Sequence, residues 1–246
     1  MKKYIIFAVI VVILTSLIIW SPWQSTPDFE KYAAGTERKA AFFEYFFPLI
    51  EKRNKEIVSK RKTLLLWSKN KNDLGWWNTK KLENLASQYR VKNFRIDDND
   101  AWKKLLSKVD VIPPSLVLAQ AANESAWGTS RFATSGNNYF GQWCFEHGCG
   151  LVPKQRDSDK VHEVAAFDSP QASLESYMQN LNSHPAYQSL RDIRTQLRME
   201  KQPVTGFALA AGLSSYSERG EEYIEELRSM MKFNNLSKYD ESINII

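Results

Sequence analysis

Residues 113–143 read PPSLVLAQAANESAWGTSRFATSGNNYFGQW, and their first half is apolar on nearly every side of a helix. Two prolines come first, Ser115 can cap a helix over residues 116–127, and Gly128 suits its C-terminal stop. A helix that is apolar all round is buried among other elements. We therefore expect a central helix against which the rest of the chain packs.

One carboxylate, Glu124, lies near the C-terminal end of this predicted helix. Desolvation and the negative end of the helix dipole both disfavour a charged carboxylate there, so the pKa of Glu124 should rise. A Glu that stays protonated near neutral pH can donate its proton to the leaving oxygen of a glycosidic bond. Gln120 and Trp127 share its helix face. The alternative is a structural Glu, held by a hydrogen bond or by Arg131.

The remaining patterns are mostly helical, so we predict a mainly α fold. The region of residues 135–168, rich in Gly and Asn, predicts an irregular loop with a small β-hairpin. Pro48 should kink or divide the first helix, and Asp100 is the expected N-cap of the third. Apolar residues at helical intervals predict helices over residues 36–66, 78–89, 100–109, 169–182, 207–213 and 221–233.

The N-terminus differs from the rest of the chain. Lys2 and Lys3 precede an apolar run over residues 4–20, which is followed by Trp23 and has no Ala-x-Ala cleavage site. We interpret it as an uncleaved signal anchor in the inner membrane, with the lysines in the cytoplasm. A cleaved signal peptide or a buried core helix are the alternatives. Either export reading places residues 24–246 outside the cytoplasm.

Charge is unevenly distributed along the chain. Residues 30–110 carry 19 basic and 11 acidic side chains, whereas residues 111–246 carry 12 and 16. The basic run at residues 52–62 could attract anionic lipid headgroups or an anionic polymer, or could be a solvated helix face. Nucleic acid is a poor partner for an exported chain without a recognition motif.

The two cysteines, Cys144 and Cys149, lie five residues apart in CFEHGC. An oxidising compartment would allow them to form a disulfide, which is the preferred interpretation, with free thiols as the alternative. His147 between them raises the possibility of zinc, but two more ligands would be needed. We expect no metal and no cofactor, because glycosidic hydrolysis needs only an acid, water and a positioned sugar.

The stretch around Glu124 resembles the core motif of the bacterial N-acetylglucosaminidases of glycoside hydrolase family 73. That motif reads approximately AQxxxESxWGxSxxAxxxNNxFG. The matching residues are Gln120, Glu124, Ser125, Trp127, Gly128, Ser130, Asn137, Asn138, Phe140 and Gly141. Segments such as WCFEHGCGLVP and YSERGEEYIEELRSM are similar to the Bax protein subfamily.

The chain divides into three expected units: a signal anchor (1–23) and a linker with a basic helical extension (24–110), both inferred from the residues above, and a domain (111–246) for which the resemblance implies a lysozyme-like glucosaminidase fold. The resemblance also implies hydrolysis of the β-1,4 bond after N-acetylglucosamine in peptidoglycan glycan strands, with Glu124 as general acid. A lytic transglycosylase is an alternative function. Such enzymes usually have a GLMQ motif after the catalytic Glu, and this chain has NNYFGQW instead, which disfavours that alternative. A membrane-tethered protein that binds peptidoglycan without cutting it is another.

Several further residues are candidates for this site. Glu163 is the first choice for a second carboxylate, ahead of Asp157 and Glu146. Alternatively the substrate's own acetamido group attacks the anomeric carbon, and Tyr216 orients it. The substrate-binding candidates are Gln120, Asn137, Asn138, Tyr139, Trp143 and Tyr223, whereas Trp127 and Phe140 should pack beneath the cleft.

Overall fold

The structure is a computed structural model that describes residues 25–154 and 161–243. The predicted signal anchor, residues 1–23, lies outside the described residues. Among the described residues, no helix has the length and apolar character needed to cross a membrane. The prediction of a mainly helical fold with a small β-structure is confirmed, whereas the lysozyme-like description and the division at residue 110 stay predictions.

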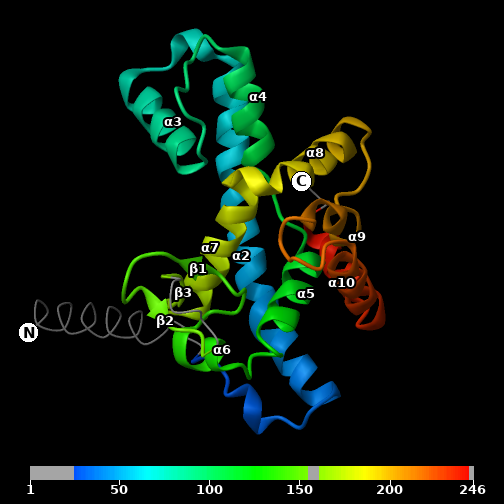
Figure 1. The fold of residues 1–246 in the computed structure, drawn as a ribbon. Coiled ribbons are helices and arrows are strands. Elements are labelled where there is room, and N and C mark those ends of the chain that lie inside the picture. Colours follow the sequence, from blue (N-terminus) through cyan, green and yellow to red (C-terminus); the bar gives the residue numbers. More distant parts are fainter. Residues whose placement is uncertain (1–24, 155–160, 244–246) are drawn as a thin grey trace, which may run out of the picture.

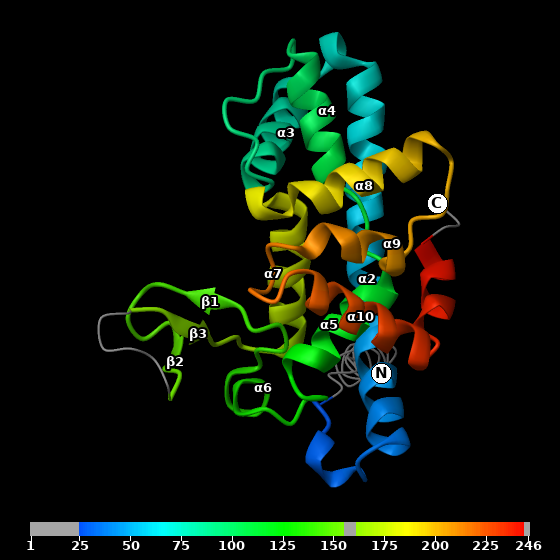
Figure 2. The ribbon, with the colours of Figure 1, turned by 45° about the vertical axis from the view of Figure 1, so that its right-hand side comes forward.

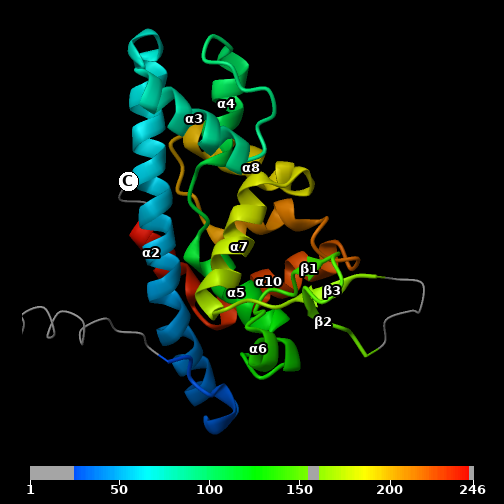
Figure 3. The same ribbon diagram turned by 90° about the vertical axis from the view of Figure 1, so that its left-hand side faces the viewer.

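Helix α2 (Thr36–Lys69) is the longest described element and runs the length of the molecule (Figure 3). Its buried face follows helical spacing through Phe42, Phe46, Ile50 and Ile57. Pro48 lies inside the helix, which continues past it, so the expected division did not occur. This face packs on α5 within one hydrophobic core.

Helix α5 (Pro114–Glu124) is the predicted central helix. Its residues 114–122 are all buried, and α2, α9 (Gly206–Leu209), α10 (Glu221–Phe233) and the 3₁₀ segment η5 (Leu236–Ile243) surround it (Figures 1 and 2). The helix ends at Glu124, three residues earlier than predicted, because Ala126 and Trp127 adopt left-handed backbone angles. Glu124 is therefore the last residue of a buried helix.

Helices α3 (Trp76–Gln88) and α4 (Asn99–Lys108) pack at one end of α2 (Figure 1). Asp98 caps α4 by accepting from the backbone N–H groups of Asp100 and Ala101, so the expected cap at Asp100 was wrong by two residues. Helix α8 (Gln188–Met199) packs on α4 and was not predicted. The other 3₁₀ segments are η1 (Phe29–Lys31), η2 (Lys71–Asp73), η3 (Pro185–Tyr187) and η4 (Ala210–Leu213).

The region after α6 (Arg131–Gly136) forms a three-stranded antiparallel sheet rather than a single hairpin. Strands β1 (Trp143–Cys144) and β2 (Gly150–Leu151) flank β3 (Glu163–Ala165), with Cys144 opposite Glu163. Helix α7 (Pro170–Ser183) follows, capped by Ser169. The sheet projects beside the C-terminal end of α5 and the start of α7 (Figure 2).

Candidate active site

A cleft of about 660 Å³ opens beside the C-terminal end of α5. Its walls come from α7, the segment after α6, the end of α3 and the loop before α10. Glu124 is the single carboxylate among the described residues that line it. The lining residues are Gln88, Arg90, Glu124, Phe140, Gly141, Gln142, Trp143, Ser176, Tyr177, Gln179, Asn180, Ser183, Tyr187 and Tyr216.

Glu124 is half-buried at the end of α5. Burial is the largest influence on its carboxyl group and raises its pKa, and hydrogen bonds from Tyr223 and Asn123 oppose this rise. Gly141, at a φ of +62°, passes so close that a Cβ atom there would lie 3.4 Å from Glu124 Oε2. The absence of a side chain at Gly141 thus leaves the cleft side of the carboxyl group open.

A chain of hydrogen bonds ends on Glu124. The Tyr177 hydroxyl donates to Gln120 Oε1, and Gln120 Nε2 donates to the Tyr223 hydroxyl over 3.0 Å. The Tyr223 hydroxyl then donates to Glu124 Oε1 over 2.7 Å. Every donor points toward the carboxyl group, so the chain fixes its rotamer and leaves Oε2 free of these contacts.

This network corrects two predictions. Gln120 and Tyr223 were expected to bind substrate, but their side chains are 0% and 1% exposed. They cannot touch a sugar, because they lie behind Glu124 rather than in the cleft. Both are positioning residues for the carboxyl group.

Tyr216 does line the cleft, as expected of a site residue. Its ring stacks on Tyr223 at 5.5 Å between centroids, with an interplanar angle of 6°. Its hydroxyl donates to the Phe140 carbonyl oxygen over 2.8 Å, which connects the loop before α10 to the segment after α6. Phe140 itself stacks on Tyr177 and is buried, as predicted.

Three residues that were predicted to contact sugar belong to the framework. Tyr139 is 2% exposed and packs on Phe42 and Phe46 of α2. Asn138 donates to the carbonyl oxygens of Gln142 and Ala165, and Asn137 donates to that of Phe167. These amides hold the loop around the cleft. Asn138 and Tyr139 are buried and do not line the cleft, which does not fit the expected sugar contacts, whereas sugar binding by the partly buried Asn137 stays a prediction.

Trp143 is the remaining aromatic candidate. It lines the cleft at the start of β1, is 59% exposed and stacks on His162 at 4.3 Å between ring centroids. An exposed ring that is held flat by a stacked neighbour can present its other face to a sugar. Sugar binding by Trp143 stays a prediction.

Glu163 lies in the sheet and is not among the residues that line the cleft. Its buried carboxylate accepts from the backbone N–H groups of Gly148 and Gly150 over 3.1 and 2.8 Å. The structure therefore does not bring Glu163 into the cleft that Glu124 lines, and its expected role as a second catalytic carboxylate stays a prediction. Glu146 is exposed and does not line the cleft, and Asp157 lies outside the described residues.

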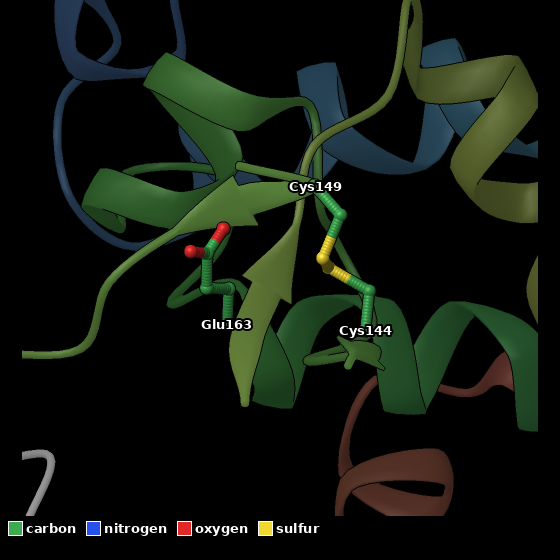
Figure 4. Close-up of side chains that lie close together, drawn as sticks. All are labelled: Cys144, Cys149 and Glu163. Atoms are coloured by element: carbon green, nitrogen blue, oxygen red, sulfur yellow. A yellow bond between two sulfur atoms is a disulfide. The ribbon is translucent and has the colours of Figure 1, made fainter. Parts of the chain in front are cut away.

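Cys144 and Cys149 form the predicted disulfide, with 6.2 Å between their Cα atoms. Figure 4 shows this bond beside the Glu163 side chain, and the three side chains place potential ligand atoms within 4.8 Å of one another. Bonded sulfur atoms carry no thiolate charge for a metal. The disulfide and Glu163 together hold the turn between β1 and β2.

Some residues that line the cleft could not be predicted from sequence patterns. Tyr177 lies at helical spacing with the apolar residues Leu174, Met178 and Leu181, and its hydroxyl contact with Gln120 cannot be inferred from that spacing. Gln88 and Arg90 come from the extension, at the end of α3, and reach the cleft only through the tertiary fold.

The family of this chain follows from a family model that matches more than half of its residues. The model for mannosyl-glycoprotein endo-beta-N-acetylglucosaminidase, or glucosaminidase, matches residues 99–236. Protein bax of Escherichia coli (strain K12) is 38% identical over 213 residues, which cover 85% of this chain and 74% of that protein. The catalytic domain of the autolysin Auto from Listeria monocytogenes is similar at 17% identity and a TM-score of 0.42, over 85% of this chain and 92% of that chain. The chain therefore belongs to the glucosaminidase family of glycoside hydrolases.

Proposed function

We propose that this protein hydrolyses the β-1,4 bond after N-acetylglucosamine in peptidoglycan, with Glu124 as general acid. The observation that carries the proposal is the position of Glu124, a carboxyl group with a raised pKa at the wall of an open cleft, fixed by Tyr223. Membership of the glucosaminidase family supports the bond type. The similarity to protein bax supports a bacterial setting, in which peptidoglycan is the glycan at hand.

The reaction begins with proton transfer. Glu124 donates its proton to the glycosidic oxygen as the bond to the anomeric carbon breaks, and that carbon gains positive charge. In one route water attacks this carbon directly and releases a proton to solvent. In the other the acetamido oxygen of the substrate attacks first, and the water that later opens the resulting ring gives its proton back to the Glu124 carboxylate. Attack by the acetamido oxygen, followed by water, gives net retention of configuration, so the first anomer seen by NMR distinguishes this route from direct inversion.

We also propose that residues 4–20 anchor the chain in the inner membrane, with the catalytic part outside the cytoplasm. Their apolar run and the preceding lysines support this topology. Peptidoglycan lies on that side of the membrane, so the anchor and the substrate are consistent. Recovery of the full chain in a salt-washed supernatant instead of the membrane fraction would contradict it.

Mass spectrometry of the products tests the reaction. Full-length protein in detergent is incubated with purified peptidoglycan, and the soluble fragments are analysed for their ends. New N-acetylglucosamine reducing ends support the proposal. Anhydro-muramic ends would identify a lytic transglycosylase, and binding without any release would identify a binding protein.

Tyr223→Phe is expected to shift the basic limb of the pH profile of kcat/KM to higher pH. The lost hydroxyl stabilises the charged form of Glu124, so its removal raises the pKa of the carboxyl group further. The loss of its fixed rotamer should lower kcat about tenfold, the equivalent of one hydrogen bond to a charged group. Tyr239→Phe is the control, because its hydroxyl has no contact with the site. An unchanged basic limb would contradict this role of Tyr223.

Glu163→Gln is expected to lower stability more than activity. The amide keeps one acceptor for the N–H groups of Gly148 and Gly150 but loses the charge, which should cost about 1–2 kcal/mol of unfolding free energy. Because Glu163 does not line the cleft, kcat should stay within about threefold of wild type. A loss of about a hundredfold in kcat by a folded variant would restore Glu163 as a catalytic carboxylate.

A further inference from the structure

One end of the cleft is built from a part of the chain that the family match does not include. Gln88 and Arg90 line the same cleft as Glu124, yet they precede residue 99, where the match begins. Along α7, Tyr177 lies at the Glu124 network and Ser183 at the far end, six residues or about 9 Å away. The cleft therefore extends well beyond Glu124 and has room for sugar units or substituents away from the bond that is cut.

The backbone of Arg90 is held firmly at this far end. Helix α3 ends in a Schellman motif, in which Arg90 N–H donates to the Ser87 carbonyl and Val91 N–H donates to that of Ala86, over 2.9 and 2.8 Å. Arg90 has a φ of +54°, a position that glycine usually fills. The fold thus needs the backbone of residue 90 but not an arginine side chain.

Lys108 joins this helix end to α7. The ammonium group of Lys108 is buried and donates to the carbonyl oxygens of Tyr89, Arg90 and Ser183 over 2.9, 3.3 and 2.9 Å. Two helix C-termini, those of α3 and α7, consequently meet on one cation, which compensates their partial negative charge. Arg90 is in this way placed beside the end of α7.

The charge at this end is positive. Arg90 is exposed, and within the described residues its guanidinium group has no ion pair or hydrogen bond. It is also the single Arg or Lys among the described residues that line the cleft. Besides burial, the positive charges of Arg90, Arg191 and Lys108 lower the pKa of the nearby His184. The backbone of Arg90 is therefore fixed, and its unpaired, planar guanidinium group is able to bind a carboxylate through two hydrogen bonds.

We propose that Arg90 binds a carboxylate of the substrate and so selects anionic over neutral glycans. This inference rests on the proposed function, since peptidoglycan carries carboxylates that a plain N-acetylglucosamine polymer lacks. Two sources have this chemistry: the lactyl carboxylate of muramic acid, once its peptide is removed, and the carboxylates of the attached peptide. The extension would thereby determine specificity for a reaction whose acid lies in α5.

Binding measurements separate charge recognition from catalysis. Full-length protein with Glu124→Gln, which leaves the ligand intact, is titrated by calorimetry with a peptide-bearing glycan tetrasaccharide and with the same fragment after its carboxylates are converted to neutral methylamides. Arg90→Gln should weaken binding of the charged fragment about tenfold, or 1.4 kcal/mol, and leave the neutral one unchanged. Arg90→Lys should keep part of the preference, and Lys81→Gln, an equal charge change on the exposed side of α3, should have no effect.

A peptide-free tetrasaccharide then distinguishes the two sources, because it keeps only the lactyl carboxylate. Arg90→Gly tests the same preference in a variant that suits the left-handed backbone at residue 90. Three outcomes would overturn the proposal. The Arg90 substitutions could weaken binding of the charged and neutral fragments equally, they could change neither, or the protein that keeps Arg90 could fail to bind the charged fragment. If the protein hydrolyses peptidoglycan but Arg90→Gln does not change its binding of the charged fragment, this inference alone is rejected. If binding depends on Arg90 and on the carboxylates but the protein with Glu124 intact never hydrolyses peptidoglycan, the proposed function alone is rejected.

Discussion

Glu124→Gln is expected to lower kcat on peptidoglycan by at least about 10²-fold, the contribution typical of a general acid. The amide has the same shape and can still accept the hydrogen bond from Tyr223, but it has no proton to give to the leaving oxygen. The initial rate of reducing-end release, at saturating substrate, is the measurement. Glu175→Gln is the matched control, because Glu175 lies on α7 outside the lining of the cleft.

Stability separates this loss from unfolding. Burial raises the pKa of Glu124, so its charged form is less stable in the folded chain than in the unfolded chain. Its contribution is most favourable below the unfolded pKa, and stability is lost as the pH rises through the folded value. At neutral pH, Glu124→Gln should therefore unfold at the same temperature as wild type or higher. A folded variant with normal activity would exclude Glu124 as the acid.

Glu124 could be identified from the sequence as a candidate acid because a lone carboxylate in an apolar helix departs from the usual pattern of a buried helix. Gln120, which was expected on the same helix face, and Tyr223, a predicted site residue from a distant segment, both belong to the hydrogen-bond network of Glu124. Their function was misjudged, since spacing along a helix shows which side chains share a face but not which of them water can reach. Asn138 was misassigned for a similar reason. The sequence does not distinguish an Asn whose amide binds loop carbonyl oxygens, as this one does, from an Asn whose amide binds a sugar.

Other parts depend on contacts between distant segments. Arg90 reaches the cleft because Lys108 connects the ends of α3 and α7, and those two ends are far apart in the sequence. Pro48 was expected to kink or divide a helix, but α2 is not divided there, because buried residues anchor it on both sides of the proline, aromatic before it and mainly aliphatic after it. Local propensity predicted the helices, whereas tertiary packing decided their ends and the composition of the cleft.

Asp110→Asn is expected to lower the free energy of unfolding by about 3–5 kcal/mol, the usual cost of removing one partner of a buried ion pair. The Asp110 carboxylate is 3% exposed and lies between three arginines. Arg198 contacts it at 2.9 Å, Arg61 at 3.5 Å and Arg194 at 4.0 Å. It therefore connects α2 and α8 immediately before α5, and the neutral amide would leave these cations, of which Arg194 is fully buried, without a counter-charge.

Urea denaturation at several pH values tests this role, with Asp192→Asn on the exposed side of α8 as a control that should change stability by less than about 0.5 kcal/mol. Burial alone would raise the pKa of Asp110, but the arginines outweigh it and hold the pKa below its ordinary value. The stabilisation is therefore fully present above the unfolded pKa and is lost as the pH falls through the folded value. The difference between wild type and Asp110→Asn should consequently be constant near neutral pH and shrink in acid. A difference that persists unchanged below the ordinary carboxylate pKa would show that packing, rather than charge, makes Asp110 necessary.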